Sequence, residues 1–145
     1  MLSITKKTGY GLIAMAYLAR LGEAELASAR QIAERFGVPM SLLMNVLKEL
    51  AAAGYVESVR GAHGGYRLAE DPGEISLADL VTAVEGPIRL AECLRGKGRD
   101  KMICNVVDRC PIADPIHRVQ RMLSDFLKNV TLAEIAEPSA AGAAR

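Results

Sequence analysis

The 145-residue chain has no tryptophan, and its aromatic residues make up only 4% of the sequence. A core must therefore be built from Leu, Ile, Val, Ala and Met, and hydrophobic residues reach 50% of the chain. Neither sign of charge is in excess, because 18 Lys and Arg stand against 17 Asp and Glu, for a net charge of +1. Bulk charge thus gives no sign of a nucleic-acid partner, and any DNA contact must come from locally placed cations.

Long apolar runs are also missing, and no stretch is long enough to span a membrane. The apolar run 11–19 follows two lysines, as in a signal peptide, but it is short and lacks a small-residue cleavage site. Its apolar residues recur at helical spacing, which predicts an amphipathic helix over about 7–22. The sequence lacks a nucleophile–base pair, a paired carboxylate motif and a phosphate loop before a helix, so we expect no enzyme.

Cysteine is confined to one stretch, which holds Cys93, Cys104 and Cys110. An odd number of thiols in so apolar a chain argues against a secreted disulfide framework and favours a reducing cytoplasm. Thiolates are soft ligands that suit iron–sulfur clusters or zinc, and the close cysteine pairs of zinc ribbons are absent. The long spacings favour a cluster, and three unrelated cysteines are the alternative. His117 lies further along the chain, and its three possible roles are a metal ligand, a helix cap or a surface residue.

Two consecutive helices joined by a tight turn are predicted upstream of the cysteines. Ser28 and Gln31 fit a capping box that opens a short helix, which Gly37 ends. A second, longer helix begins near Pro39 and ends at Gly54, so that the pair forms a helix-turn-helix. One apolar stripe runs along the second helix: Leu42, Leu43, Val46, Leu47 and Leu50.

A β-hairpin is predicted directly after this pair. Residues 55–59 and 66–69 alternate like strands, and the glycine-rich stretch 60–65 forms the turn. A helix-turn-helix followed by a hairpin makes a winged helix. We therefore expect a mainly α fold with a small β-hairpin, in which residues 1–86 form a winged helix-turn-helix DNA-binding domain.

The exposed side of the second helix is expected to enter the major groove of double-stranded DNA. Asparagine can read a base edge, and serine and lysine suit phosphates or bases. The start of the preceding helix and the glycine-rich wing supply further contacts. The expected DNA contacts are Arg30, Gln31, Met40, Ser41, Met44, Asn45, Lys48, Arg60, Gly61 and His63. The alternative is a winged helix that binds protein and never touches DNA.

A heptad seam follows the cysteines, with apolar residues at alternating steps of three and four: Ile116, Val119, Leu123, Phe126 and Val130. A small winged helix cannot bury such a seam, so we expect a homodimer through this helix. Packing against the chain's own first helix is the alternative. The expected organisation after the winged helix is a sensor loop over 87–115, the dimerisation helix and a last short helix over 116–136, and a disordered tail over 137–145.

Several strings resemble the Rrf-type winged-helix transcriptional regulators. The wing string VRGAHGGYRL at 59–68, together with the cysteine run, carries most of the specificity. This is the family of the iron–sulfur regulator IscR, the nitric-oxide sensor NsrR and the SUF-system regulators, and the SUF branch is the most similar. The resemblance covers residues 1 to about 136, and its other strings are KTGY at 7–10, ISLAD at 75–79, EGPI at 85–88, EC at 92–93 and NVTLAE at 129–134.

The resemblance implies a homodimer with domain-exchanged contacts along the long helix, and a 2Fe–2S or 4Fe–4S cluster held by the three cysteines. The fourth ligand departs from the family's patterns. Ala113 stands where the IscR-like pattern has a histidine, and Gly9 stands where the NsrR-like pattern has an aspartate. His117, one helical turn beyond Ala113, is then the first substitute. Asp108, Asp114 and an exogenous ligand rank after it.

The recognition helix departs from the family's pattern too. Met44 replaces the base-reading glutamate of the IscR-like pattern, and Asn45 replaces a common glutamine. Arg60 of the wing is retained, so the resemblance implies an operator that differs from the IscR type.

The leading interpretation is a dimeric DNA-binding transcriptional regulator that senses iron–sulfur cluster or redox status through its three-cysteine loop. The alternative is a regulator of the same fold without a cluster, which uses its cysteines as thiol switches or as a zinc site. In the leading interpretation, the state of the cluster would alter the ordering of the loop and the position of the long helix, and so bias the spacing of the two recognition helices.

Overall fold

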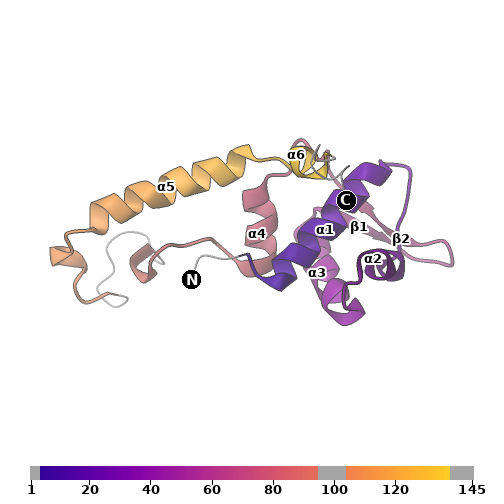
Figure 1. The fold of residues 1–145 in the computed structure, drawn as a ribbon, viewed down its shortest axis with the longest axis horizontal. Helices are drawn as coiled ribbons and strands as arrows, with labels where there is room; N and C mark the ends of the chain where they lie inside the picture. The colour runs from indigo at the N-terminus through magenta and orange to yellow at the C-terminus, as the bar shows by residue number, and fades with distance from the viewer. Residues whose placement is uncertain (1–3, 95–103, 138–145) are drawn as a thin grey trace, which may run out of the picture.

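The computed structural model describes residues 4–94 and 104–137, which form a winged-helix body and a projecting helical arm (Figure 1). Residues 138–145 of the predicted disordered tail lie outside the described residues. No helix within the described ranges is long and apolar enough to cross a lipid bilayer. The elements are α1 (Lys6–Leu21), α2 (Ala29–Phe36), α3 (Met40–Ala52), β1 (Val56–Val59), β2 (Gly65–Leu68), α4 (Leu77–Glu85), α5 (Ala113–Asn129) and α6 (Leu132–Ala136), with short 3-10 helices at Glu92–Leu94 and Val107–Arg109.

Side-chain caps set where the helices begin. The Ser28 hydroxyl accepts from the Gln31 backbone N–H at 3.1 Å, and the Gln31 side-chain oxygen accepts from the Ser28 N–H at 2.8 Å. This capping box satisfies two amides at the start of α2. Gly37 ends α2 with a left-handed φ of 64°. The predicted helix-turn-helix of α2 and α3 is therefore confirmed, and equivalent boxes at Ser76 and Thr131 open α4 and α6.

The hairpin docks on the body through its second strand. β1 and β2 pair antiparallel with Val56 opposite Leu68 and Ser58 opposite Tyr66. The Tyr66 N–H donates to the Ala27 carbonyl at 2.8 Å, and the Ala27 N–H donates to the Tyr66 carbonyl at 3.0 Å. A Cβ at Gly65 would lie 2.8 Å from the Ala27 carbonyl oxygen, so glycine is required for this close approach. The wing is thereby fixed to the chain just ahead of α2.

The core is aliphatic, as the absence of tryptophan requires. Gly11 lets α1 approach α3 closely, because a Cβ there would lie 2.9 Å from Val46 Cγ1. Leu132 of α6 is fully buried in the same core, and the Arg20 side chain donates to the Ala136 carbonyl at 2.6 Å. The last helix thus packs on α1 of the winged helix. Fully buried core side chains include Met15, Ile32, Leu43, Leu47, Leu50 and Ile75.

Two local predictions need correction. Leu42 was expected in the buried stripe of α3 but is 42% exposed, because the buried face is formed by Leu43, Val46, Leu47 and Leu50. The long helix α5 begins at Ala113, three residues before the predicted start at 116. Pro115 lies within its first turn, where no intrahelical N–H bond is lost.

The arm formed by α5 extends away from the body and packs against α4 (Figure 1). The segment that joins α4 to α5, residues 86–112, carries all three cysteines and is called the cysteine segment below. Its two described parts, 86–94 and 104–112, contain the short 3-10 helices.

Candidate nucleic-acid interface and cysteine segment

The exposed face of α3 carries polar side chains in register. Ser41, Asn45 and Lys48 are all exposed and recur at helical spacing. Met40 is 43% exposed at the start of the same helix. Met44, which the sequence placed among the contacts, is half-buried and packs against the core. The helix therefore presents a short stripe of hydrogen-bonding groups with a methionine at its edge.

Two side chains at the start of α2 that were expected to contact DNA also make contacts within the helix. Arg30 is exposed, and its Nε donates to the Glu34 carboxylate at 2.8 Å, one turn along the helix. This contact raises the pKa of the Arg30 guanidinium, mainly through the hydrogen bond and then through the charge of Glu34. The side-chain oxygen of Gln31 is held by the Ser28 N–H. The expected DNA contacts at 30 and 31 thus carry local helix contacts as well.

The turn of the wing is rich in glycine and carries an exposed arginine. Arg60, Gly61 and His63 are all exposed, and Gly61 has a φ of 127° that side chains rarely adopt. A Cβ at Gly64 would lie 2.2 Å from the Val59 carbonyl oxygen, so this position also requires glycine. The wing turn extends from the same end of the body as α2 and α3 (Figure 1).

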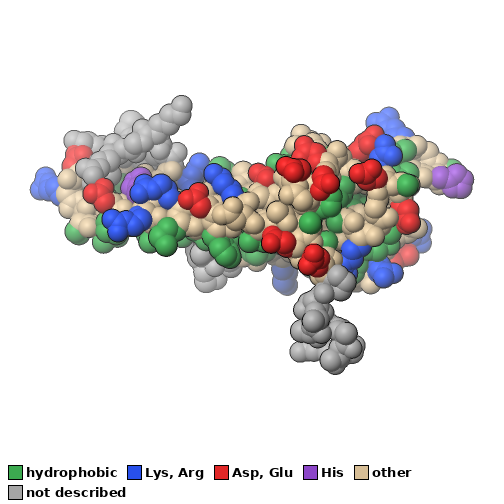
Figure 2. Space-filling model, turned by 90° about the horizontal axis from the view of Figure 1, so that it is seen from above, with side chains coloured by type: hydrophobic (Ala, Val, Ile, Leu, Met, Phe, Trp, Pro, Cys, Tyr) green, Lys and Arg blue, Asp and Glu red, His purple; other side chains and the backbone are tan. Residues whose placement is uncertain are grey.

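Seen from the side of α5 and α6, the body carries mainly acidic charge (Figure 2). Asp and Glu side chains gather over the middle of this face, while Lys and Arg gather toward the free end of the arm (Figure 2). The near-zero net charge of the chain therefore conceals an uneven distribution of charge over its surface.

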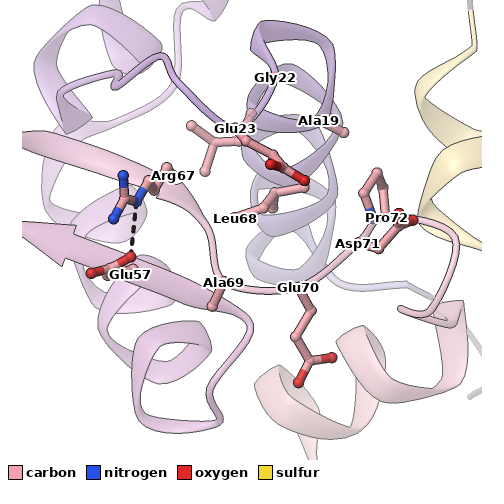
Figure 3. Close-up of a pocket in the computed structure, with 11 residues that line it drawn as sticks. Ala19, Gly22, Glu23, Glu57, Arg67, Leu68, Ala69, Glu70, Asp71 and Pro72 are labelled. Atoms are coloured by element: carbon pink, nitrogen blue, oxygen red, sulfur yellow. Dashed lines mark hydrogen bonds and ion pairs between the residues drawn. The ribbon is translucent and has the colours of Figure 1, made fainter.

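A cavity of about 490 Å³ lies at the base of the wing (Figure 3). Carboxylates of Glu23, Glu57, Glu70 and Asp71 line it, and Arg67 pairs with Glu57 at 2.8 Å. Neither the exposed stripe of α3 nor any cysteine contributes to its walls. The cavity is therefore separate from both candidate sites.

A polar network that the sequence did not reveal joins α1, α3 and α4. Lys7 Nζ lies 2.8 Å from Glu49 Oε1 of α3 and donates to the Val84 carbonyl of α4 at 3.2 Å. The Thr8 hydroxyl, only 1% exposed, donates to Glu85 at 2.6 Å, and the Thr5 hydroxyl donates to the same oxygen. These contacts tie α3 to the end of α4, from which the chain enters the cysteine segment.

We predict a pH-dependent contribution from Glu85. Hydrogen bonds from Thr5 and then from Thr8, with the charge of Lys7, lower the pKa of this carboxyl. A carboxyl whose pKa is lower in the folded state stabilises above its unfolded value, about 4.3 for glutamate, and this stabilisation is lost as the pH falls through the folded pKa. Urea unfolding of Glu85→Gln between about pH 5 and 3 should therefore show a shallower loss of stability than the unmutated protein. The exposed Glu74→Gln variant serves as the control. Equal slopes for Glu85→Gln and the unmutated protein would contradict the assignment.

The three thiols are free and half-exposed. Cys93 lies in the 3-10 helix Glu92–Leu94, and Cys110 follows the 3-10 helix Val107–Arg109. Among the described residues, no group of three or more His, Cys, Asp or Glu side chains is placed to hold a metal ion. The single chain therefore does not bring Cys93, Cys104, Cys110 and His117 together, although the chemistry of three soft thiolates fits a metal cluster.

The candidate fourth ligand His117 is half-exposed on α5. Ala113, which occupies the histidine position of the IscR-like pattern, is only 4% exposed and has no donor atom. Within the described part of the chain, His117 and the cysteines do not form a group of three or more side chains that could hold a metal ion.

The arm leaves an apolar surface open to solvent. Val119 is 49% exposed, and Met122 and Phe126 are each 64% exposed. Figure 2 shows hydrophobic side chains along one edge of the arm. Leu123 is half-buried and lines an apolar groove of about 280 Å³ with Val81 of α4. The heptad seam is thus packed in part on α4, and its exposed remainder has no cover within the described residues.

Comparison with known proteins gives consistent matches over almost the whole chain. The Rrf2 family profile, described as an iron-dependent transcriptional regulator, matches residues 4–138. The structure is similar to CymR (YrzC), the global cysteine regulator of B. subtilis, with 30% identity and a TM-score of 0.72 over 94% of this chain and 97% of that one.

Two further solved structures are similar at nearly the same level. T. potens IscR shares 29% identity with a TM-score of 0.69, over 92% of this chain and 85% of that one. The oxidized form of CymR from Staphylococcus aureus shares 29% identity with a TM-score of 0.71, over 94% of this chain and 98% of that one.

Proposed function

Because the chain belongs to the Rrf2 family of transcriptional regulators, which are not enzymes, we propose that it is a homodimeric regulator that reads a two-fold operator. Its cysteine segment would report cluster or redox status to the DNA-binding helices. The prediction that the chain is not an enzyme is confirmed by the family.

The exposed stripe of α3 carries the proposal of direct DNA readout. In a helix-turn-helix, the second helix lies in the major groove with its N-terminal residues on base edges. Asn45 offers the bidentate amide that pairs with adenine, and Ser41 and Lys48 offer groups for bases or phosphates. Arg60 on the wing supplies a cation beside them. An exposed stripe of hydrogen-bonding side chains supports a winged helix that binds DNA over one that binds only protein.

We predict separable effects of the two contacts on a selected operator. Asn45→Ala should lose about 1–3 kcal/mol of discrimination at one base pair, because one base edge loses its partner. Arg60→Ala should weaken binding at all sites and reduce the salt dependence, as loss of a phosphate contact does. The exposed Asn129→Ala and Arg118→Ala variants are matched controls for amide and charge. Fluorescence anisotropy that shows no change for either variant would rule out this docking.

Dimerisation is proposed from the uncovered side of α5. A surface of this kind on one helix is typical of a helix that packs on a second copy. Two copies related by a two-fold axis would place their recognition helices on half-sites about one helical turn of DNA apart, roughly 34–36 Å.

An iron–sulfur cluster of the 2Fe–2S or 4Fe–4S type is the first candidate for the sensor. Cys93, Cys104 and Cys110 would hold it, with His117 or an exogenous group as the fourth ligand. Support comes from the donor chemistry and from the family's iron-dependent description. When bound, the cluster would supply a redox- and oxygen-sensitive centre, and the chain would supply thiolates and their placement against α5.

A thiol switch is the second candidate, and one observation favours it. The three thiols are free and half-exposed, which leaves each accessible to an oxidant. The similarity to a global cysteine regulator and to an oxidized form of CymR is compatible with this role. A zinc site at the same thiols is a further variant. The ultraviolet–visible spectrum and metal content of anaerobically purified protein separate the three.

A further inference from the structure

One side chain of α5 joins the start of the cysteine segment to the arm. The Gln120 side chain of α5 donates its amide N–H to the Ile88 carbonyl at 2.8 Å. Its amide oxygen accepts from the Leu90 backbone N–H at 2.9 Å. All three residues are half-buried. The oxygen and the nitrogen of one side-chain amide are therefore both bonded to the backbone, at two residues that are separated by one position.

Only a side-chain amide can make this pair of bonds from one terminal group in the same plane. A carboxylate has no donor for the Ile88 carbonyl, and a methionine of similar length has neither a donor nor a strong acceptor. The arrangement imitates one step of a parallel β-ladder, in which one residue donates to and accepts from the two residues that flank its partner on the neighbouring strand. The stretch 88–90 is thus fixed in register as well as in distance from α5.

The position of this clamp relates it to the thiols. Leu90 lies three residues before Cys93, on the side where the chain enters the cysteine segment from α4. Cys110 lies three residues before Ala113, where α5 begins, and the Ala113 N–H donates to the Cys110 carbonyl at 3.4 Å. Gln120 is seven residues further along α5, roughly 10 Å at 1.5 Å per residue. One helix therefore fixes the chain on both sides of the cysteines.

We infer that Gln120 is a positioning residue that holds the Cys93 side of the cysteine segment in register with α5, so that Cys93 moves together with the helix that begins three residues after Cys110. The inference deepens the proposed function, because a sensor needs its thiols placed against the dimerisation helix. The clamp itself is a property of the single chain and is measurable whether or not the thiols sense anything.

Hydrogen exchange and thiol alkylation on the reduced full-length protein test this inference. In Gln120→Met, which keeps the length of the side chain, exchange of the Leu90 amide should rise by roughly fivefold or more, the weight of one net hydrogen bond. Alkylation of Cys93 by iodoacetamide should quicken relative to Cys110 in the same sample. Arg121→Met, at the exposed neighbouring position, should leave both rates unchanged.

Each outcome decides the inference. Unchanged Leu90 exchange in Gln120→Met overturns the clamp. Raised exchange with an unchanged Cys93 rate overturns the positioning role. Should Gln120→Met fail to fold, Gln120→Glu keeps the acceptor for Leu90 and loses the donor to Ile88, and Cys93 should again react faster. If both rates respond while the protein neither holds iron nor changes operator affinity on oxidation, the clamp stands and the proposed sensor fails.

Discussion

Phe126→Asp should convert a dimer into monomers. Phe126 is 64% exposed in the single chain, so the substitution leaves the fold of one protomer almost untouched. In the proposed dimer the same position lies within an apolar interface, where an unpaired carboxylate costs several kcal/mol, on the order of 3–5. Sedimentation velocity across a range of concentrations should therefore show a dissociation constant raised by at least about a hundredfold, since each 1.4 kcal/mol is tenfold.

The control for this change lies on the same helix. Arg121→Asp also places a carboxylate at an exposed position of α5, but it lies outside the heptad seam and should leave the association unchanged. Leu123→Asp should dissociate the dimer too, although Leu123 also lines the groove against α4 and its loss will lower the stability of the single chain. A monomeric unmutated protein, or a Phe126→Asp variant that associates normally, contradicts the proposed interface.

Replacing any one of the three cysteines should abolish cluster loading. Anaerobic reconstitution of Cys93→Ala, Cys104→Ala and Cys110→Ala should give iron and sulfide near the background level, because a cluster that has lost one of three thiolate ligands is poorly held. His117→Ala should reduce loading if this side chain is the fourth ligand. His63→Ala on the wing is the matched control, since these are the two histidines of the chain.

The pattern of loading separates the candidates. Full iron content in one cysteine variant removes that residue from the ligand set. Absence of iron in the reconstituted unmutated protein removes the cluster and leaves the thiol switch or zinc site. Full loading in His117→Ala shifts the fourth ligand to another group.

The parts of the fold that the sequence predicts are those set by neighbouring residues. The Ser28–Gln31 box and Gly37 determine where α2 begins and ends through contacts at most five residues apart. The wing follows from strand alternation and from glycines whose backbone conformation or close contacts exclude a side chain. Such local signals are readable without the tertiary structure.

The errors arise where tertiary packing decides. Periodicity puts Leu42 beside the buried stripe of α3, but no element among the described residues covers it, and it is left 42% exposed. Met44 was expected among the exposed DNA contacts, but it is partly buried and packs against the core. Contacts between distant residues, such as Lys7 with Glu49 and Gln120 with Ile88, leave no periodic trace in the sequence.

The candidate site divides in the same way. The thiols and the exposed polar side chains of α3 are recognised by their residue types, which the sequence gives directly. The relative positions of the thiols depend on how the chain folds between α4 and α5. The spacing of the cysteines therefore predicts soft ligands, but it does not predict whether the three thiols come together in space. The structure adds the connections: Lys7 between α3 and α4, and Gln120 between the cysteine segment and α5.

The most direct measurement of the central claim is operator affinity in two states of one preparation. Anaerobically purified protein is bound to a selected operator at a fixed salt concentration, before and after its cysteines are oxidised or stripped of metal. The account predicts a change in Kd of about 5- to 150-fold, the usual range of allosteric coupling, and no change in the triple Cys→Ala variant. An identical Kd in both states, or no sequence-specific binding in either, would contradict it.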